Sequence, residues 1–175
     1  MNLRPKIEVF LSYAKLDEDA ARDLWGRLAV QLAVSGRYEF TTWQFLDAIL
    51  PGDDFHQEII AALERSAIGV FALSAPFLAS SYIADHELPA FVNAAGPAAG
   101  PSTGHVAGKR AVPVMLGHFD VRTANLRGLE PLQVYAKDRP YAALRRAADK
   151  DQWAADLATA IHRIAGARLG IAPAV

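Results

Sequence analysis

The side chains best suited to chemistry in this sequence are carboxylates and histidines, because its 175 residues include no cysteine. The lack of cysteine excludes disulfides, thiolate metal sites and cysteine catalysis. The five histidines include no H-x-x-x-H pair, and we expect no metal site. The sequence also lacks a glycine-rich phosphate loop and a G-x-S-x-G nucleophile motif. The candidate catalytic residues are therefore found among the 19 acidic side chains.

Glu87 differs from the other acidic residues in its sequence surroundings. It lies between the apolar residues Ile83 and Leu88, and the helical period places Ile83 one turn before it on the same face. The helix is expected to begin near the carboxyl edge of a sheet, where α/β proteins bind ligands. Two interpretations of Glu87 remain open: a functional acid at this edge, or an exposed acid that complements the helix dipole.

Strands and helices are expected to alternate along the chain. Short apolar runs predict strands at 7–13, 38–45, 68–73, 111–116 and 132–135. Helical spacing predicts helices over 17–34, 55–65, 77–95 and 151–169. Pro89 is expected to kink or split the third helix, because proline cannot continue the hydrogen-bond ladder. This order predicts an α/β fold with a parallel sheet and helices on both faces.

The composition describes an ordinary globular chain. Apolar residues make up 52% and charged residues 21%, and the formal net charge is −1, so the basic excess of a nucleic-acid binder is missing. No apolar run is long enough for a membrane span, and we expect a cytoplasmic protein. Residues 1–170 are predicted to form a single domain, with 171–175 as a tail or the start of a linker. A flexible loop is expected over 95–110.

Several short motifs, in their order along the chain, resemble the Toll/interleukin-1 receptor (TIR) domain of the bacterial type. The opening box V-F-[IL]-S-[YF] is matched by Val9 to Tyr13. The second strand and the loop that follows it, called the BB loop in this family, are matched by Trp43 to Glu58, including Pro51-Gly52. The segment that carries the family's functional acid is matched by Phe71 to Leu88. Val112 to Val114 and Trp153 resemble the fourth strand and the start of the last helix, so the resemblance covers about residues 5–166.

The resemblance implies a flavodoxin-like, three-layer fold with a five-stranded parallel sheet, and one of two functions. Many bacterial and plant TIR domains cleave NAD+ at the nicotinamide–ribose bond, and many animal ones only assemble with other TIR domains as scaffolds. The acid of the cleaving members corresponds to Glu87. Plant and animal members often carry an aromatic residue four positions before that acid, where this chain has Ile83. Tyr82 lies five positions before it, so either a substrate contact or a core position remains open for Tyr82.

The implied chemistry needs one carboxylate, because nicotinamide leaves in its cationic form without a proton. The carboxylate would stabilise the ribosyl cation or capture it covalently, and NAD+ would be a substrate, with no cofactor. The residues expected to contact substrate are Ser12, Tyr13, Lys15, Phe45, Asp47, Tyr82 and Ile83. Ser12, Tyr13 and Lys15 are expected at the ribose or phosphate, with ordinary loop polarity as the alternative. Phe45 and Phe55 are interpreted as core residues or as stacking platforms for a base.

The apolar residues of the BB loop predict an interface. Leu46, Ile49 and Leu50 are apolar residues on a loop that should face water, and we expect Ile49, Leu50, Pro51 and Gly52 to contact another TIR domain in a head-to-tail array. The alternative is that Ile49 and Leu50 fold onto the core of their own chain. The chain is predicted to be an effector of bacterial antiviral defence, either alone or joined to a C-terminal or separate ligand-sensing domain. A response-regulator or flavin-binding domain is a weaker alternative, because the first and third strands do not end in a phosphoacceptor aspartate.

Overall fold

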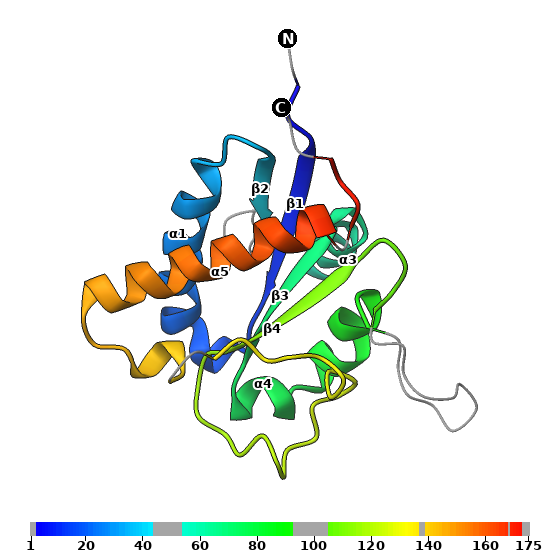
Figure 1. The fold of residues 1–175 in the computed structure, drawn as a ribbon. Helices are drawn as coiled ribbons and strands as arrows, with labels where there is room; N and C mark the ends of the chain where they lie inside the picture. The colour runs from blue at the N-terminus through cyan, green and yellow to red at the C-terminus, as the bar shows by residue number, and fades with distance from the viewer. Residues whose placement is uncertain (1–2, 44–53, 93–104, 137–138, 168, 173–175) are drawn as a thin grey trace.

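Four parallel strands form the centre of the molecule (Figure 1). The computed structural model describes residues 3–43, 54–92, 105–136, 139–167 and 169–172. Within these ranges the strands are β1 (Lys6–Ser12), β2 (Glu39–Trp43), β3 (Ile68–Leu73) and β4 (Arg110–Met115). Their order is β2-β1-β3-β4, and each neighbouring pair is parallel. The direction in which the chain adds strands therefore reverses between β1 and β3, which is where sheets of this kind bind ligands.

Helices cover both faces of the sheet, as the alternation of side chains along the strands requires. Ile7, Val9 and Leu11 of β1 pack in one core with helices α1 (Glu18–Ala33) and α5 (Ala147–Ala167). Phe10 points to the other face. There it packs with α3 (Phe55–Arg65) and α4 (Ala75–Ala79). Figure 1 shows α5 crossing the strands beside α1. The three-layer α/β arrangement predicted from the sequence is confirmed.

The prediction of a fifth strand over 132–135 is wrong, because the sheet formed by the described residues has four strands. Residues 132–135 contribute a single parallel bridge, between Tyr135 and Val114 of β4. The backbone of Tyr135 accepts a hydrogen bond from Met115 (2.8 Å) and donates one to Pro113 (2.8 Å). This segment lies at the edge of the sheet, where only β4 offers backbone partners, and its apolar side chains are only partly buried. It therefore pairs at one position and does not extend into a ladder.

The long helix predicted over 77–95 is also wrong, because its described part consists of three short pieces. Helix α4 ends at Ala79. A π-turn, η2 (Ile83–Glu87), and a 3-10 turn, η3 (Leu88–Ala90), follow it. The hydroxyl of Ser80 accepts a hydrogen bond from the backbone of Ile83 (3.3 Å), so it caps the start of the second piece. The expected effect of Pro89 is borne out in part: the π-turn changes to a 3-10 turn beside Pro89, but the chain leaves helical geometry earlier, at Ser80, whose backbone is extended.

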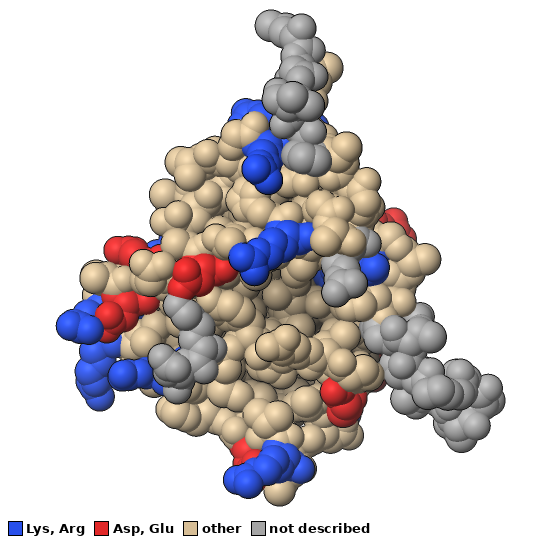
Figure 2. Space-filling model, in the orientation of Figure 1, with Lys and Arg blue, Asp and Glu red and all other residues tan. Residues whose placement is uncertain are grey.

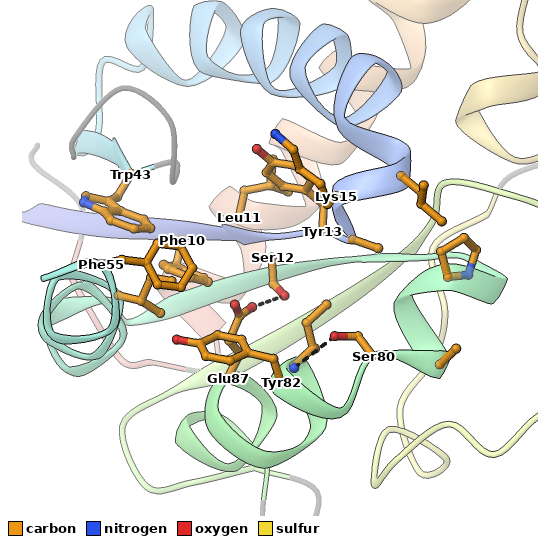
Figure 3. A pocket seen from close by; sticks show the side chains of 16 residues that line it. Phe10, Leu11, Ser12, Tyr13, Lys15, Trp43, Phe55, Ser80, Tyr82 and Glu87 are labelled. Atoms are coloured by element: carbon orange, nitrogen blue, oxygen red, sulfur yellow. Dashed lines mark hydrogen bonds between the residues drawn. The ribbon is translucent and has the colours of Figure 1, made fainter. Parts of the chain in front are cut away.

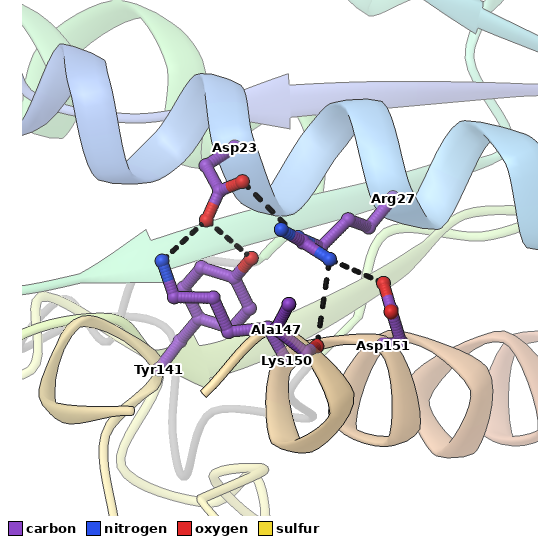
Figure 4. Close-up of polar contacts among 6 residues, drawn as sticks. All are labelled: Asp23, Arg27, Tyr141, Ala147, Lys150 and Asp151. Atoms are coloured by element: carbon purple, nitrogen blue, oxygen red, sulfur yellow. Dashed lines mark hydrogen bonds and ion pairs between the residues drawn. The ribbon is translucent and has the colours of Figure 1, made fainter. Parts of the chain in front are cut away.

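A polar clasp joins α1 to the C-terminal part of the chain (Figure 4). The Asp23 carboxylate of α1 accepts hydrogen bonds from Lys150 (2.7 Å), the Tyr141 hydroxyl (2.9 Å) and Arg27 (3.1 Å). Arg27 also donates to Asp151 of α5. Burial alone would raise the pKa of Asp23, but these hydrogen bonds outweigh burial and lower it. The clasp therefore fixes α5 against α1 with an ionised Asp23.

Asp23→Asn is expected to lower the free energy of unfolding by about 1–2 kcal/mol at neutral pH. The substitution removes the negative charge of the carboxylate and so weakens the hydrogen bonds that it accepts from Lys150, Tyr141 and Arg27. The folded-state pKa of Asp23 is depressed, so its stabilising contribution is present above the unfolded pKa of 3.8. The contribution is lost as the pH falls through the folded-state pKa. Urea unfolding at pH 7 and pH 3 measures this difference. Asp19→Asn, at an exposed position of the same helix, is the matched control and should change stability by a few tenths of a kcal/mol.

Charges of both signs are interspersed on the face shown in Figure 2. Acidic and basic side chains lie together in a band across the middle of this face, where α5 runs, and again at its lower edge, and the area between is largely uncharged. In the part of the chain that the structure describes, no helix is both long enough and apolar enough to cross a membrane.

Candidate active site

A cavity of about 600 Å³ opens at the carboxyl ends of β1 and β2, beside the chain that follows β3 (Figure 3). Its position is the switch point between β1 and β3, as the sheet order predicts. Its volume is in the range of small-molecule sites. The cavity is lined by Phe10, Leu11, Ser12, Tyr13, Ala14, Lys15, Leu16, Trp43, Phe55, Ile59, Pro76, Ala79, Ser80, Tyr82, Ile83 and Glu87.

Glu87 is the buried acid of this cavity. Its side chain belongs to the π-turn, is 8% exposed, and accepts a hydrogen bond from the hydroxyl of Ser12. Burial raises the pKa of Glu87 to about 7, and the Ser12 hydroxyl opposes part of this rise. The interpretation of Glu87 as an exposed acid is therefore wrong, because the core on the α3 and α4 side of the sheet and the end of β1 enclose it. Figure 3 shows the carboxyl group directed toward Ser12.

The π-turn explains how Tyr82 reaches the same cavity as Glu87. In a regular α-helix, residues five positions apart are rotated by about 140° and face different directions. In the π-turn the N–H of Leu88 bonds to the carbonyl of Ile83, five residues earlier, so each turn holds one more residue. Tyr82 and Glu87 both line the cavity as a result. Tyr82 therefore lies at the site, and Ile83 is a buried core residue (4% exposed) whose side chain also reaches the cavity wall.

Tyr82 is held by aromatic neighbours from α3 and from its own turn. Its hydroxyl lies 3.1 Å from Nδ1 of His56, and its ring centroid lies 4.8 Å from that of His86 and 5.9 Å from that of Phe55. Burial, followed by the negative charges of Glu87 and Asp54, raises the pKa of Tyr82. The phenol therefore stays protonated, and its ring forms a fixed wall beside the carboxyl group.

The structure brings the residues predicted near the ribose or phosphate to this cavity. Ser12, Tyr13 and Lys15 all line it. Tyr13 also packs partly against the core on the α1 and α5 side of the sheet. The Lys15 side chain is 75% exposed at the cavity mouth, and its ammonium group forms an ion pair with Glu18.

The predicted BB-loop residues lie outside the residues that the structure describes. These are Phe45, Asp47, Ile49, Leu50, Pro51 and Gly52. Phe55, at the start of α3, is described and lines the cavity with 42% of its surface exposed. Its interpretation as a core residue is therefore wrong: Phe55 is the first residue of α3, and its ring lies at the cavity beside Tyr82.

The sequence analysis missed one residue that lines the cavity, Trp43, and one that holds a lining residue from behind, His56. Trp43 is the last residue of β2 and stacks on Phe10 with ring centroids 5.1 Å apart, which closes one side of the cavity. Its position at the carboxyl end of a strand was a usable signal. His56 follows the Asp54 cap, whose carboxylate accepts hydrogen bonds from the backbone of His56 (3.1 Å) and Gln57 (3.3 Å). Its partner Tyr82 is 26 residues away, so no local pattern could have revealed the pair.

The arrangement is suited to stabilising positive charge on a bound molecule. A carboxylate at the floor of a largely apolar cavity interacts strongly with a cation because little water screens it. The rings of Trp43 and Tyr82 provide flat surfaces against which a planar heterocycle could pack. Among the described residues, no cluster of three or more histidine and acidic side chains could hold a metal ion.

The sheet order and the cavity at its switch point define a flavodoxin-like α/β domain with a ligand site at the carboxyl edge. Comparison with protein-family models matches residues 9–159 to the TIR domain. The match covers most of the chain, and the protein therefore belongs to the TIR domain family. A search of curated proteins finds no match for this sequence.

Proposed function

We propose that this TIR domain cleaves NAD+ at the nicotinamide–ribose bond, with Glu87 as the catalytic residue. The observation that carries the proposal is the buried Glu87 carboxyl at the floor of the cavity of about 600 Å³. TIR domains include members that cleave NAD+, and the acid of those members corresponds to Glu87. In this function NAD+ is a substrate, and no cofactor takes part.

The reaction needs little proton transfer from the protein. The C–N bond between nicotinamide and the anomeric carbon breaks, and both bonding electrons leave with the nicotinamide ring, which becomes neutral. The ribose is left as an oxocarbenium-like cation. The Glu87 carboxylate stabilises that charge or bonds to the anomeric carbon until water or another nucleophile replaces it. Only the ionised form of Glu87 can do either.

The supporting features are the aromatic walls and the charge at the cavity mouth. The Tyr82 ring, fixed by His56, can pack on the nicotinamide beside the carboxylate. Lys15 at the mouth can approach the diphosphate of the substrate.

Incubating the protein with NAD+ and measuring nicotinamide by chromatography tests the proposal. A protein that assembles but releases no nicotinamide would instead favour the non-catalytic TIR–TIR scaffold.

Tyr82→Ala is expected to reduce kcat/KM for NAD+ by about tenfold, because it removes an aromatic surface worth about 0.5–1.5 kcal/mol and loosens the wall beside Glu87. Tyr82→Phe keeps the ring and removes the hydrogen bond to His56, so it should lose only about two- to threefold. Steady-state nicotinamide release measures both variants. Equal activity of wild type and Tyr82→Ala would place the substrate elsewhere.

We further propose that the active form is a head-to-tail assembly of TIR domains, formed through the BB loop, in an effector of antiviral defence. TIR domains commonly interact with other TIR domains. Leu16, 86% exposed, and Phe55, 42% exposed, add apolar surface at the mouth of the cavity. Exposed apolar residues gathered beside a site are typical of an interface.

Specific activity is expected to rise with protein concentration, by tenfold or more between dilute and concentrated protein, and Ile49→Asp in the BB loop should abolish this rise. Nicotinamide release per milligram, measured across that range together with light scattering, checks the prediction. Val34→Asp is the matched control. Val34 is 77% exposed at the C-terminal end of α1, at the opposite edge of the sheet from the cavity. Concentration-independent activity in all three proteins would show that the monomer has a complete site.

A further inference from the structure

Ser12 connects the central strand of the sheet to the buried acid. It is the last residue of β1, is 1% exposed, and donates its hydroxyl hydrogen to Oε2 of Glu87. The two residues are 75 positions apart in the chain and meet only because the π-turn folds over the end of β1. The contact therefore depends on the fold and not on a local turn.

The position of the Ser12 hydroxyl is set by the sheet. β1 is paired on both sides, and Ser12 lies in register with Phe71 of β3. A donor on a doubly paired strand is already ordered before ligand binds, so little further conformational entropy is lost when it holds a carboxylate. Because 1% of its surface is exposed, the same hydroxyl has little freedom to turn away toward a ribose.

We infer that Ser12 is a positioning residue for NAD+ cleavage, which holds the Glu87 carboxylate in place and favours its charged form, and that it is not a contact to the ribose. The inference rests on the proposed function of Glu87. A buried carboxylate requires a hydrogen-bond donor, because its charge has lost water. A hydrogen bond to the charged form favours that form over the neutral acid.

Other titratable groups near Glu87 come from the π-turn itself and from three neighbouring segments. His86, in the π-turn, packs against the ring of Tyr82. Tyr82, on the chain leading into the π-turn, stays a phenol, because burial raises its pKa. Nδ1 of His56, on α3, lies 3.1 Å from the Tyr82 hydroxyl, and Asp54 caps the same helix. Lys15, after β1, is paired with Glu18 at the mouth of the cavity. These groups are unchanged in a Ser12 variant, so a shift in its pH profile reports on the bond between Ser12 and Glu87.

Ser12→Ala tests the inference through the pH dependence of nicotinamide release. The midpoint of the acidic limb should rise by about one pH unit or more, because the hydrogen bond that favours the carboxylate is lost. Activity at pH 7 should therefore fall about fivefold or more, and at pH 9 it should return to within about twofold of wild type. Ser12→Thr retains the hydroxyl and should keep the wild-type midpoint.

Ser66→Ala is the matched control. Ser66 is also 1% exposed, and its hydroxyl has no hydrogen-bond partner in the described structure, so the same atomic change leaves Glu87 untouched. Its pH profile should equal that of wild type. If Ser12→Ala loses the same factor at every pH, Ser12 is a substrate contact and the inference is wrong. An unchanged profile overturns it as well.

Direct titration of the Glu87 carboxyl by carbon-13 NMR separates this inference from the proposed function. The measurement needs no turnover, and the Glu87 pKa should be higher in Ser12→Ala than in wild type. A higher pKa in a protein that releases no nicotinamide would uphold the pairing of Ser12 with Glu87 and reject the NAD+ reaction. An unchanged Glu87 pKa in an active enzyme would reject the role of Ser12 alone.

Discussion

Glu87→Gln should reduce nicotinamide release from NAD+ by at least about a hundredfold while the protein remains folded. Glutamine has nearly the shape of glutamate, and its amide oxygen can still accept the Ser12 hydrogen bond. The substitution therefore removes the negative charge beneath the ribosyl cation and little else. Release should be measured at the highest protein concentration, where any assembly is complete, with circular dichroism to check the fold.

Asp85→Asn is the matched control for this loss. Asp85 lies in the same π-turn as Glu87, but its side chain is exposed. It should retain nearly full activity. If Glu87→Gln keeps more than about a tenth of the wild-type rate, the carboxylate is not the catalytic group. In that case another group of the protein performs the cleavage.

The same Glu87→Gln substitution should stabilise the fold at alkaline pH. The pKa of Glu87 rises from 4.5 to about 7 on folding, so between these values the folded protein binds a proton that the unfolded chain has released. Stability of the wild type therefore falls as the pH rises through this window and is constant above it. The total effect is about 3 kcal/mol, and the uncharged glutamine avoids it.

Urea unfolding at pH 5 and pH 8 measures this difference. The two proteins should be similar at pH 5, and Glu87→Gln should be the more stable at pH 8. Asp85→Asn keeps Glu87 and changes only an exposed side chain, so its stability should fall between pH 5 and pH 8 by the same amount as that of the wild type. Equal stability of Glu87→Gln and wild type at pH 8 would show that the Glu87 carboxylate bears no burial cost. The proposed activity thus requires the negative charge of Glu87, whereas the stability of the fold is greater without it.

Most strands and helices could be predicted from the sequence because their hydrophobic periods are strong. The run IGVFAL matches β3 residue for residue, and the helix predicted over 55–65 matches α3. The fifth strand could not be predicted correctly. Whether 132–135 extends into a ladder depends on the hydrogen bonds available at the sheet edge, and the apolar pattern contains no information about them.

The candidate site was predictable in part. The sequence pointed to Glu87, Ser12 and the loop after the first strand, and all of them line the cavity. The burial of Glu87 could not be read from its neighbours, because the enclosing residues come from the end of β1 and from a π-turn that no local pattern indicates. The contact between His56 and Tyr82 could not be predicted either, because the two residues are 26 positions apart in the sequence.

The π-turn has a consequence for how related sites can be recognised. The direction in which the acid points depends on its angle around the axis of the turn. A π-turn holds an extra residue, so the acid and the aromatic residue can face the same way although they are five positions apart in the sequence and not four. A search pattern that requires an aromatic residue four places before the glutamate would reject this chain, although Tyr82 lies beside the acid in space. Patterns that also allow a separation of five should recover proteins with the same geometry. Conversely, deleting one residue between Tyr82 and Glu87 would restore the usual spacing but shift every residue that follows, including Pro89, relative to the core.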